Sequence, residues 1–222
     1  RYIADYGPYP AWKDTTAKYY PCGEEMYPDL LADLERAERF IFLEYFIMAE
    51  GEIWDRLSDI LCRKSRQGVE VKLIFDDFGS MMRMPNEKID ALQDAGVEVR
   101  VFNPVHHYVN RLYFNYRDHR KITCVDGDIA YTGGANIADE YANLIERFGY
   151  WKDCGLRLEG EGAWGLTREF LQMWQRMDGQ LYHEYDYYRP LHHPLEQGFC
   201  QTVVDGPDDN PNNAAEDLFL QM

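Results

Sequence analysis

Two basic side chains mark the part of the sequence that could carry chemistry. His119 and Lys121 are separated by a single residue. On a β-strand, residues i and i+2 point to the same face, so the imidazole and the ammonium group would aim together. An imidazole beside an ammonium group suits a phosphodiester, because one group attacks phosphorus or carries a proton while the other neutralises phosphate oxygens. A histidine near a lysine is by itself more often a surface pair, just as two adjacent glycines more often form a turn. The prediction of phosphodiester chemistry therefore depends on the joint pattern of these two residues with Gly133, Gly134 and Asn136.

The residues that follow predict an anion site. Gly133 and Gly134 have no side chains, so their backbone amides can approach a phosphate closely, and the Asn136 amide can donate to the same oxygens. Between residues 106 and 121, four basic residues stand against Asp118 alone, in a chain whose net charge is −16; they are Arg111, Arg117, Arg120 and Lys121. We expect this segment to form a basic patch that concentrates an anion.

Acidic residues near the motif have separate predicted roles. Asp126 has the opposite strand parity to His119, so we expect it to point away from the site and to fix the turn at Gly127. Glu44 lies within an apolar strand and needs a buried partner such as an arginine. Asp76 and Asp77 end another strand, where a structural role is favoured over cation binding.

Histidine pairs elsewhere carry weaker signals. His106 and His107 precede an aromatic run that would either lie at an apolar interface or pack as a loop over the core. His192 and His193 lie between prolines without a carboxylate or cysteine at ligand spacing, so a linker is favoured over a metal site. We predict no metal centre.

Hydrophobic periodicity predicts the elements that would position these residues. Helical spacing occurs at residues 26–37, 53–61, 89–96 and 163–174, and strand patterns occur at 39–48, 69–75, 97–102 and 153–158. Residues 122–125 and 129–132 read as a hairpin. This order predicts an α/β fold with a mixed β-sheet flanked by helices on both faces.

The motif and its surroundings resemble a known family. The pattern HxKxxxxD followed by GGxN resembles the HKD motif of the phospholipase D superfamily. Further segments are similar to the first catalytic half of a bacterial cardiolipin synthase, and they cover nearly the whole chain; they include residues 20–26, 40–46, 68–71, 76–80, 101–104, 136–141 and 151–160. The resemblance implies a phospholipase D-like α/β sandwich.

The resemblance also implies a reaction and roles. Such enzymes transfer a phosphatidyl group between two phosphatidylglycerol molecules through a phosphohistidine, giving cardiolipin and glycerol without cofactors. His119 would be the nucleophile or the acid, while Lys121 and Asn136, with Gly133 and Gly134, would bind phosphate. Asp153 would orient the histidine. Its strand parity is opposite to that of the apolar residues Cys154, Leu156 and Leu158, which agrees with this role. The alternative is that Asp153 is a surface carboxylate at the start of a strand. Asp126 would be structural.

The expected organisation follows from the same resemblance. Residues 1–18 would be a leading segment after a missing N-terminal membrane region, 19–178 the HKD domain, 179–199 a linker, and 200–222 the truncated start of a second such domain. The partners would be phosphatidylglycerol or other anionic phospholipids, and either the second HKD half or a second copy of the chain. The location would be the cytoplasmic side of the cell membrane, with the anchors outside this sequence.

Composition limits the alternatives. The 222 residues are enough for one good-sized core, and the five scattered cysteines, odd in number, do not suggest a disulfide framework. A net charge of −16 argues against nucleic acid as a partner, and hence against a nuclease with a broad basic groove. A homodimeric phosphodiesterase or nuclease of the same superfamily and a non-catalytic interaction module remain the alternative functions.

Overall fold

The computed structural model describes residues 10–105, 116–178, 185–195 and 199–204, together with residues 216 and 220. The strands are β1 (Thr15–Tyr20), β2 (Phe40–Tyr45), β3 (Glu70–Asp76), β4 (Glu98–Phe102), β5 (Lys121–Val125), β6 (Ile129–Gly133) and β7 (Gly155–Gly160). The helices are α2 (Gly23–Arg36), α3 (Glu52–Arg66), α4 (Asp77–Ser80), α5 (Asn86–Asp94) and α6 (Ala163–Asp178), with short 3₁₀ helices η3 (Asp139–Ala142) and η4 (Tyr185–Tyr188).

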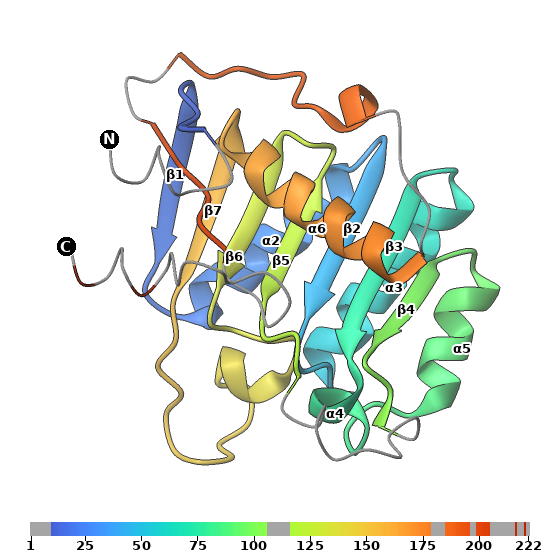
Figure 1. Cartoon of the computed structure of the whole chain (residues 1–222). Helices are drawn as coiled ribbons and strands as arrows, with labels where there is room; N and C mark the ends of the chain where they lie inside the picture. Colours follow the sequence, from blue (N-terminus) through green and yellow to red (C-terminus); the bar gives the residue numbers. More distant parts are fainter. Residues whose placement is uncertain are drawn as a thin grey trace.

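The strands form one mixed sheet in the order β1-β7-β6-β5-β2-β3-β4 (Figure 1). β2, β3 and β4 run parallel, whereas β5 pairs antiparallel with β2. Tyr45, the last residue of β2, therefore lies opposite Lys121, the first residue of β5. We call the edge where β2 and β3 end and β5 begins the site edge; it is the lower edge of the sheet in Figure 1.

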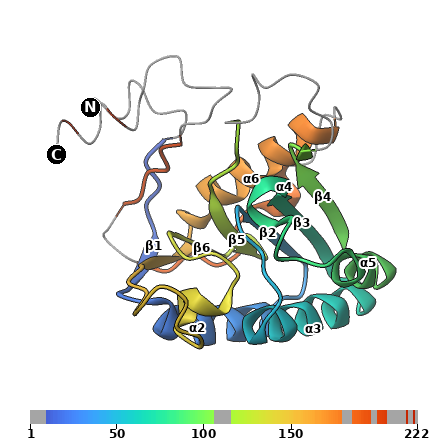
Figure 2. The same ribbon diagram turned by 90° about the horizontal axis from the view of Figure 1, so that it is seen from below.

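Helices cover both faces of this sheet, as the order of patterns predicted. Figure 2 shows α2, α3 and α5 along one face and α6 across the other. On the α2–α3 face, the buried core includes Trp54 and Leu57. On the α6 face, Phe42 stacks on Phe170 with ring centroids 4.7 Å apart. Two buried faces explain why every residue of β2 is buried.

The leading segment contains a strand that periodicity did not reveal. β1 begins at Thr15, inside the range 1–18, and pairs antiparallel with β7 so that Thr15 lies opposite Gly160. It is an edge strand whose middle residues are exposed, so it lacks the apolar alternation of a half-buried strand. Near the other end of the chain, Cys200 forms an isolated bridge with Trp12. Residues 199–204 therefore lie against this domain and form no regular strand.

One further detail corrects the sequence interpretation. Cys154 is exposed and precedes β7, so the apolar side of that strand consists of Leu156 and Leu158 without it. All five cysteines are free, and only Cys22 and Cys124 are buried.

In the part of the chain that the structure describes, no helix combines the length and apolarity needed to cross a membrane.

Candidate active site

The structure brings His119 and Lys121 together at the site edge. Lys121 opens β5, and its Nζ lies 3.1 Å from Nδ1 of His119. The imidazole packs against Phe46, directly after β2, with ring centroids 4.5 Å apart. His119 is exposed, whereas Lys121 is buried. Solvent thus reaches the imidazole, and the ammonium group contacts it from the buried side.

Asp76, at the end of β3, fixes the segment that carries His119. The buried carboxylate accepts the backbone N–H of Asp118 at 3.0 Å and a guanidinium N–H of Arg117 at 3.2 Å. It also accepts the N–H of Gly79, which begins the turn of α4. Asp77 accepts the backbone N–H of Val105 at 2.6 Å. Both carboxylates therefore hold backbone segments in place, which is the structural role favoured by the sequence.

The predicted basic patch does not form a single surface. Arg120 has the opposite strand parity to His119 and points to the α6 face, where its Nε lies 2.7 Å from Glu44 Oε1. Asp118 and Glu169 of α6 complete the group around its guanidinium. Glu44 thus has the arginine partner that burial required. Strand alternation, which placed His119 and Lys121 together, also removes Arg120 from them.

Asn136 lies at the same edge, after β6, and is buried. Its Oδ1 accepts the backbone N–H of Ile47 at 2.9 Å, and its Nδ2 donates to Tyr141 Oη at 2.9 Å. Tyr27 donates to its carbonyl oxygen. These contacts hold the amide beside the end of β2. The second N–H of the amide is the group with which Asn136 could meet a phosphate.

Packing explains both glycines before Asn136. A Cβ at Gly133 would come within 2.3 Å of the Cys154 carbonyl oxygen, and one at Gly134 would lie 2.0 Å from Asp153 Oδ1. The Gly134 N–H donates to the Cys154 carbonyl oxygen at 3.1 Å. The glycines thus allow β7 to begin against the end of β6, and the Gly134 amide is engaged in the sheet.

Asp153 contacts this glycine turn. Its Oδ1 accepts the N–H of Cys154 at 2.8 Å. Its charge favours the protonated form of Lys121, and Lys121, rather than Asp153, is the group beside Nδ1 of His119. The structure therefore places Asp153 within electrostatic range of the ammonium group. The role in orienting His119 remains a prediction.

Asp126 lies at the opposite end of β5. Its carboxylate accepts the backbone N–H groups of Glu38, Arg39 and Phe40 at 2.8, 2.7 and 2.9 Å. It occupies a left-handed conformation with φ of 56°, which aspartate tolerates. Asp126 therefore ties the β5–β6 turn to the start of β2 and takes no part in the site edge.

Burial sets the protonation states at the site. The imidazole of His119 reaches solvent but is partly buried, and this partial burial lowers its pKa below the usual 6.5; the charge of Lys121 adds to the effect. Burial also lowers the pKa of Lys121 to about 8, although Asp118, Asp153 and Asp76 oppose the shift. At pH 7 the imidazole is neutral and the ammonium group is charged. A neutral imidazole is a competent nucleophile, and the charged lysine stabilises anionic oxygens.

Some candidates fall elsewhere. His106, His107 and Arg111 lie outside the described residues. His192 pairs with Asp128 at 2.8 Å and His193 with Glu161 at 2.9 Å, so the two imidazoles have different partners.

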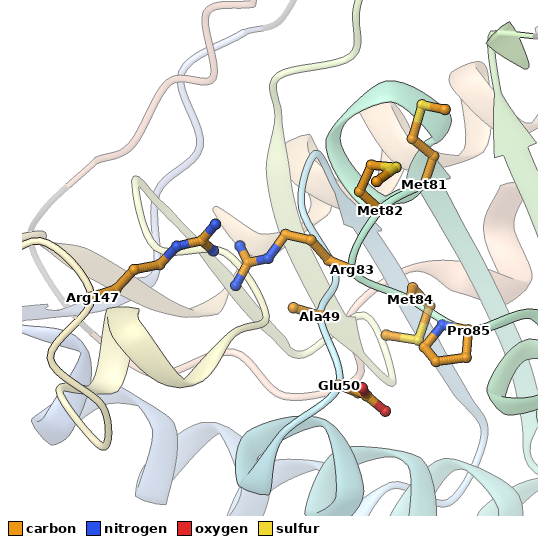
Figure 3. Close-up of a pocket in the computed structure, with 8 residues that line it drawn as sticks. All are labelled: Ala49, Glu50, Met81, Met82, Arg83, Met84, Pro85 and Arg147. Atoms are coloured by element: carbon orange, nitrogen blue, oxygen red, sulfur yellow. The ribbon is translucent and has the colours of Figure 1, made fainter.

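The sequence reasoning missed a pocket of 430 Å³ that Figure 3 shows beside the site edge. Arg83 and Arg147 meet there, although they are 64 positions apart in the sequence. No short motif carries this signal.

Comparison with known families matches residues 30–147 to a domain described as "Cardiolipin synthase, PLD-like domain". This range is more than half of the chain. An uncharacterized protein of Streptococcus mutans is 38% identical over 224 residues, which cover 100% of this chain and 48% of that protein. A cardiolipin synthase of Geobacillus kaustophilus is 40% identical over 190 residues, which cover 84% of this chain and 37% of that protein. The chain thus spans less than half the length of these relatives.

Solved structures share the fold. A phosphatidylserine synthase from Haemophilus influenzae has a TM-score of 0.65 at 15% identity, over 98% of this chain and 56% of that one. NucT from Helicobacter pylori has a TM-score of 0.55 at 12% identity, over 74% of this chain and 96% of that one. At these identities the likeness concerns the fold alone. The match of residues 30–147 to the family model shows that the chain belongs to the phospholipase D-like domain family of cardiolipin synthases.

Proposed function

We propose that the chain is one catalytic half of a phosphatidyltransferase that makes cardiolipin from two phosphatidylglycerol molecules. The observation that carries the proposal is the exposed, neutral imidazole of His119 beside the buried, charged ammonium group of Lys121. One group supplies a nucleophile and the other neutralises the phosphate oxygens. The family of the chain narrows the phosphodiester to a phospholipid.

The proposed first step forms a phosphatidyl-histidine. A ring nitrogen of His119 bonds to the phosphorus of phosphatidylglycerol, and the bond from phosphorus to the glycerol oxygen breaks. That oxygen takes a proton from a second imidazole and leaves as glycerol. Lys121 and the remaining N–H of Asn136 stabilise the charge on the phosphate oxygens.

The second step returns the phosphatidyl group to oxygen. The terminal hydroxyl of another phosphatidylglycerol gives its proton to the second imidazole and bonds to phosphorus, while the bond between His119 and phosphorus breaks. One phosphodiester replaces another, so the exchange needs no external energy source. The second imidazole comes from another HKD half or from a second copy of the chain.

A substrate with a good leaving group tests His119 without the second imidazole. A 4-nitrophenyl ester of phosphatidic acid releases nitrophenolate, which leaves without a proton, so attack by His119 alone should give a burst of colour and a chain labelled with lipid phosphate. His119→Ala should lower the burst rate by several powers of ten. His192→Ala is the matched control, because this imidazole is also exposed but lies at the opposite end of the sheet, where it pairs with Asp128.

The outcomes are distinct. A burst that is lost with His119→Ala and kept with His192→Ala supports the proposal. No burst from the folded wild-type chain, or a burst rate for His119→Ala within about tenfold of wild type, overturns it. Cleavage of single-stranded DNA in place of the lipid ester would favour the nuclease alternative.

A further inference from the structure

The 430 Å³ pocket beside the site edge is lined by three separate segments. Ala49 and Glu50 follow β2, residues 81–85 follow α4, and Arg147 comes from the loop after η3. His119, Lys121 and Asn136 are not among the lining residues. The pocket is therefore a feature separate from the catalytic constellation, and its own chemistry can be considered.

Two guanidinium groups face each other in this pocket (Figure 3). The buried carboxylate of Glu140 holds both, with Oε1 2.7 Å from Nη2 of Arg83 and 3.2 Å from Nη1 of Arg147. A carboxylate offers about four acceptor sites, whereas two guanidinium groups carry about ten N–H donors. Glu50 points away from the arginines in Figure 3. The pair thus keeps donors and one net positive charge for a further anion, in a chain of net charge −16.

The flanks of the pocket are apolar and open to solvent. Met82 is 87% exposed and Met81 is 48% exposed. The loop that carries Arg147 also exposes Ile145 and Phe148, which do not line the pocket. Exposed large apolar side chains next to a cationic pocket match a ligand that has an anionic head and apolar tails. Methionine suits such a contact because its flexible side chain adapts to acyl chains.

Hydrogen bonds connect the pocket rigidly to the catalytic edge. The N–H of Ala49 donates to the carbonyl oxygen of Ile137 at 2.9 Å, and Ile137 follows Asn136 directly. Asp139, which opens η3, accepts the first two N–H groups of α3, from Glu52 and Ile53. The arginine pair is therefore held at a fixed place relative to Asn136.

We propose that Arg83 and Arg147 bind the phosphodiester headgroup of a second anionic phospholipid, with its acyl chains along Met81 and Met82. Bidentate guanidinium–phosphate contacts are strong and directional, so the pair would select an anionic headgroup over a zwitterionic one. This inference rests on the proposed function, because it assigns the pocket to the acceptor lipid. It adds a binding site that the HKD motif does not contain.

Equilibrium binding measures this site without turnover. Short-chain phosphatidylglycerol, below its micelle concentration, is titrated calorimetrically into the His119→Ala chain. We expect Arg147→Gln to weaken binding about tenfold or more, because it removes one of the two phosphate contacts. Arg189→Gln is the matched control: Arg189 is similarly exposed and carboxylate-paired, but lies beside the β5–β6 turn at the far end of the sheet.

Further titrations distinguish the contribution of the lipid headgroup to binding from that of the acyl chains. Met82→Ser should weaken binding of short-chain phosphatidylglycerol but not of glycerol phosphate, and short-chain phosphatidylcholine should bind less tightly than phosphatidylglycerol. Arg83→Lys keeps a cation for Glu140, so it tests the guanidinium fork in a variant that retains the buried ion pair.

The pocket assignment is overturned if the His119→Ala chain binds short-chain phosphatidylglycerol equally well with and without Arg147→Gln. It is also overturned if glycerol phosphate binds more tightly than the lipid. If the folded wild-type chain gives no nitrophenolate burst while lipid binding still depends on Arg147, the proposed function is overturned and this binding site is retained.

Discussion

At the scale of single residues, the contact between His119 and Lys121 has opposite effects on the two groups. The ammonium charge disfavours protonation of the imidazole, and burial disfavours the ammonium charge itself. Near neutral pH the imidazole is therefore uncharged and can act as a nucleophile, while the lysine beside it is charged. The lysine loses this charge when the pH rises past about 8. The reaction therefore has a narrow pH range in which both groups are in their working states.

We predict a bell-shaped pH profile for the nitrophenolate burst. The rate should fall below pH 6.5 as His119 gains a proton, and it should fall again above about pH 8 as Lys121 loses one. Lys121→Arg keeps the charge at alkaline pH, so the alkaline fall should disappear even if the rate drops. The burst rate constant, measured from acid to alkaline pH for wild type and Lys121→Arg, checks this. An alkaline fall that persists unchanged in Lys121→Arg would show that another group titrates.

Sequence parity predicted some side-chain directions and missed others for a physical reason. His119 and Lys121 lie together, as their spacing predicted. Asp126 lies away from them, as predicted, but the reason is that it follows the far end of β5 in a left-handed turn conformation rather than that it has the opposite parity on a strand. Strand alternation carries Arg120 to the other face, where three carboxylates lie; a sum of charges along the sequence could not show this. The meeting of Arg83 with Arg147 depends on tertiary folding and has no local pattern.

At the scale of elements, Asp126 joins two strands that are remote in sequence. We predict that Asp126→Ala lowers the free energy of unfolding by ~2–4 kcal/mol, because three backbone N–H groups lose a charged acceptor. Chemical denaturation measures the change. The burst per folded chain should stay at the wild-type level, since this turn lies at the far end of β5.

Asp186→Ala is the control for this effect. Asp186 pairs with Arg189 at 3.3 Å and its side chain is almost fully exposed, so we expect a change within ~0.5 kcal/mol. An equal loss of stability in the two variants would contradict the role given to Asp126.

The buried charges behind β5 predict how stability responds to pH. Burial, with the charge of Asp118, raises the pKa of Glu44 well above 4.5, although Arg120 opposes the shift. Between pH 4.5 and the folded-state pKa, the folded protein keeps a proton that the unfolded chain has lost. Glu44 therefore makes stability fall as pH rises through this range. Glu44→Gln should remove that fall, as seen in denaturation curves measured from pH 4.5 upward.

The matched control for Glu44→Gln is Asp59→Asn. Asp59 lies on α3 with its side chain largely exposed and 3.9 Å from Arg63, so its charge is well solvated. This variant should keep the wild-type dependence of stability on pH. Identical dependence in wild type and Glu44→Gln would mean that Glu44 does not titrate in this range.

Elements with two buried faces or a clear helical stripe were predictable, and edge elements were not. The helices α2, α3 and α6 and the strands β2, β3 and β4 lie where periodicity placed them, because burial dictates their residue types. β1 was not predicted, because an edge strand with exposed residues needs no apolar alternation in its sequence. Cys154 looked apolar in the pattern but precedes β7 and is exposed, since the strand begins only at Gly155.

At the scale of the whole molecule, the described chain provides one catalytic imidazole where the proposed reaction needs two. Attack on phosphorus occupies His119, so the same ring cannot also protonate the leaving glycerol. The relatives offer room for another half, because the chain covers 37% of the Geobacillus kaustophilus cardiolipin synthase. A second copy related by a two-fold axis would also bring a second His119 to the site edge.

We predict that glycerol release from phosphatidylglycerol by this chain rises with its dimer fraction. Glycerol, unlike nitrophenolate, needs a proton to leave, so a lone His119 should not release it at an appreciable rate. Release is measured against protein concentration, with the oligomeric state followed by sedimentation. Mixing in His119→Ala chains should lower release more steeply than dilution, because mixed dimers hold one imidazole. Mixing in His192→Ala chains should not. Undiminished specific activity at dilutions where the chain is monomeric would refute the need for two imidazoles.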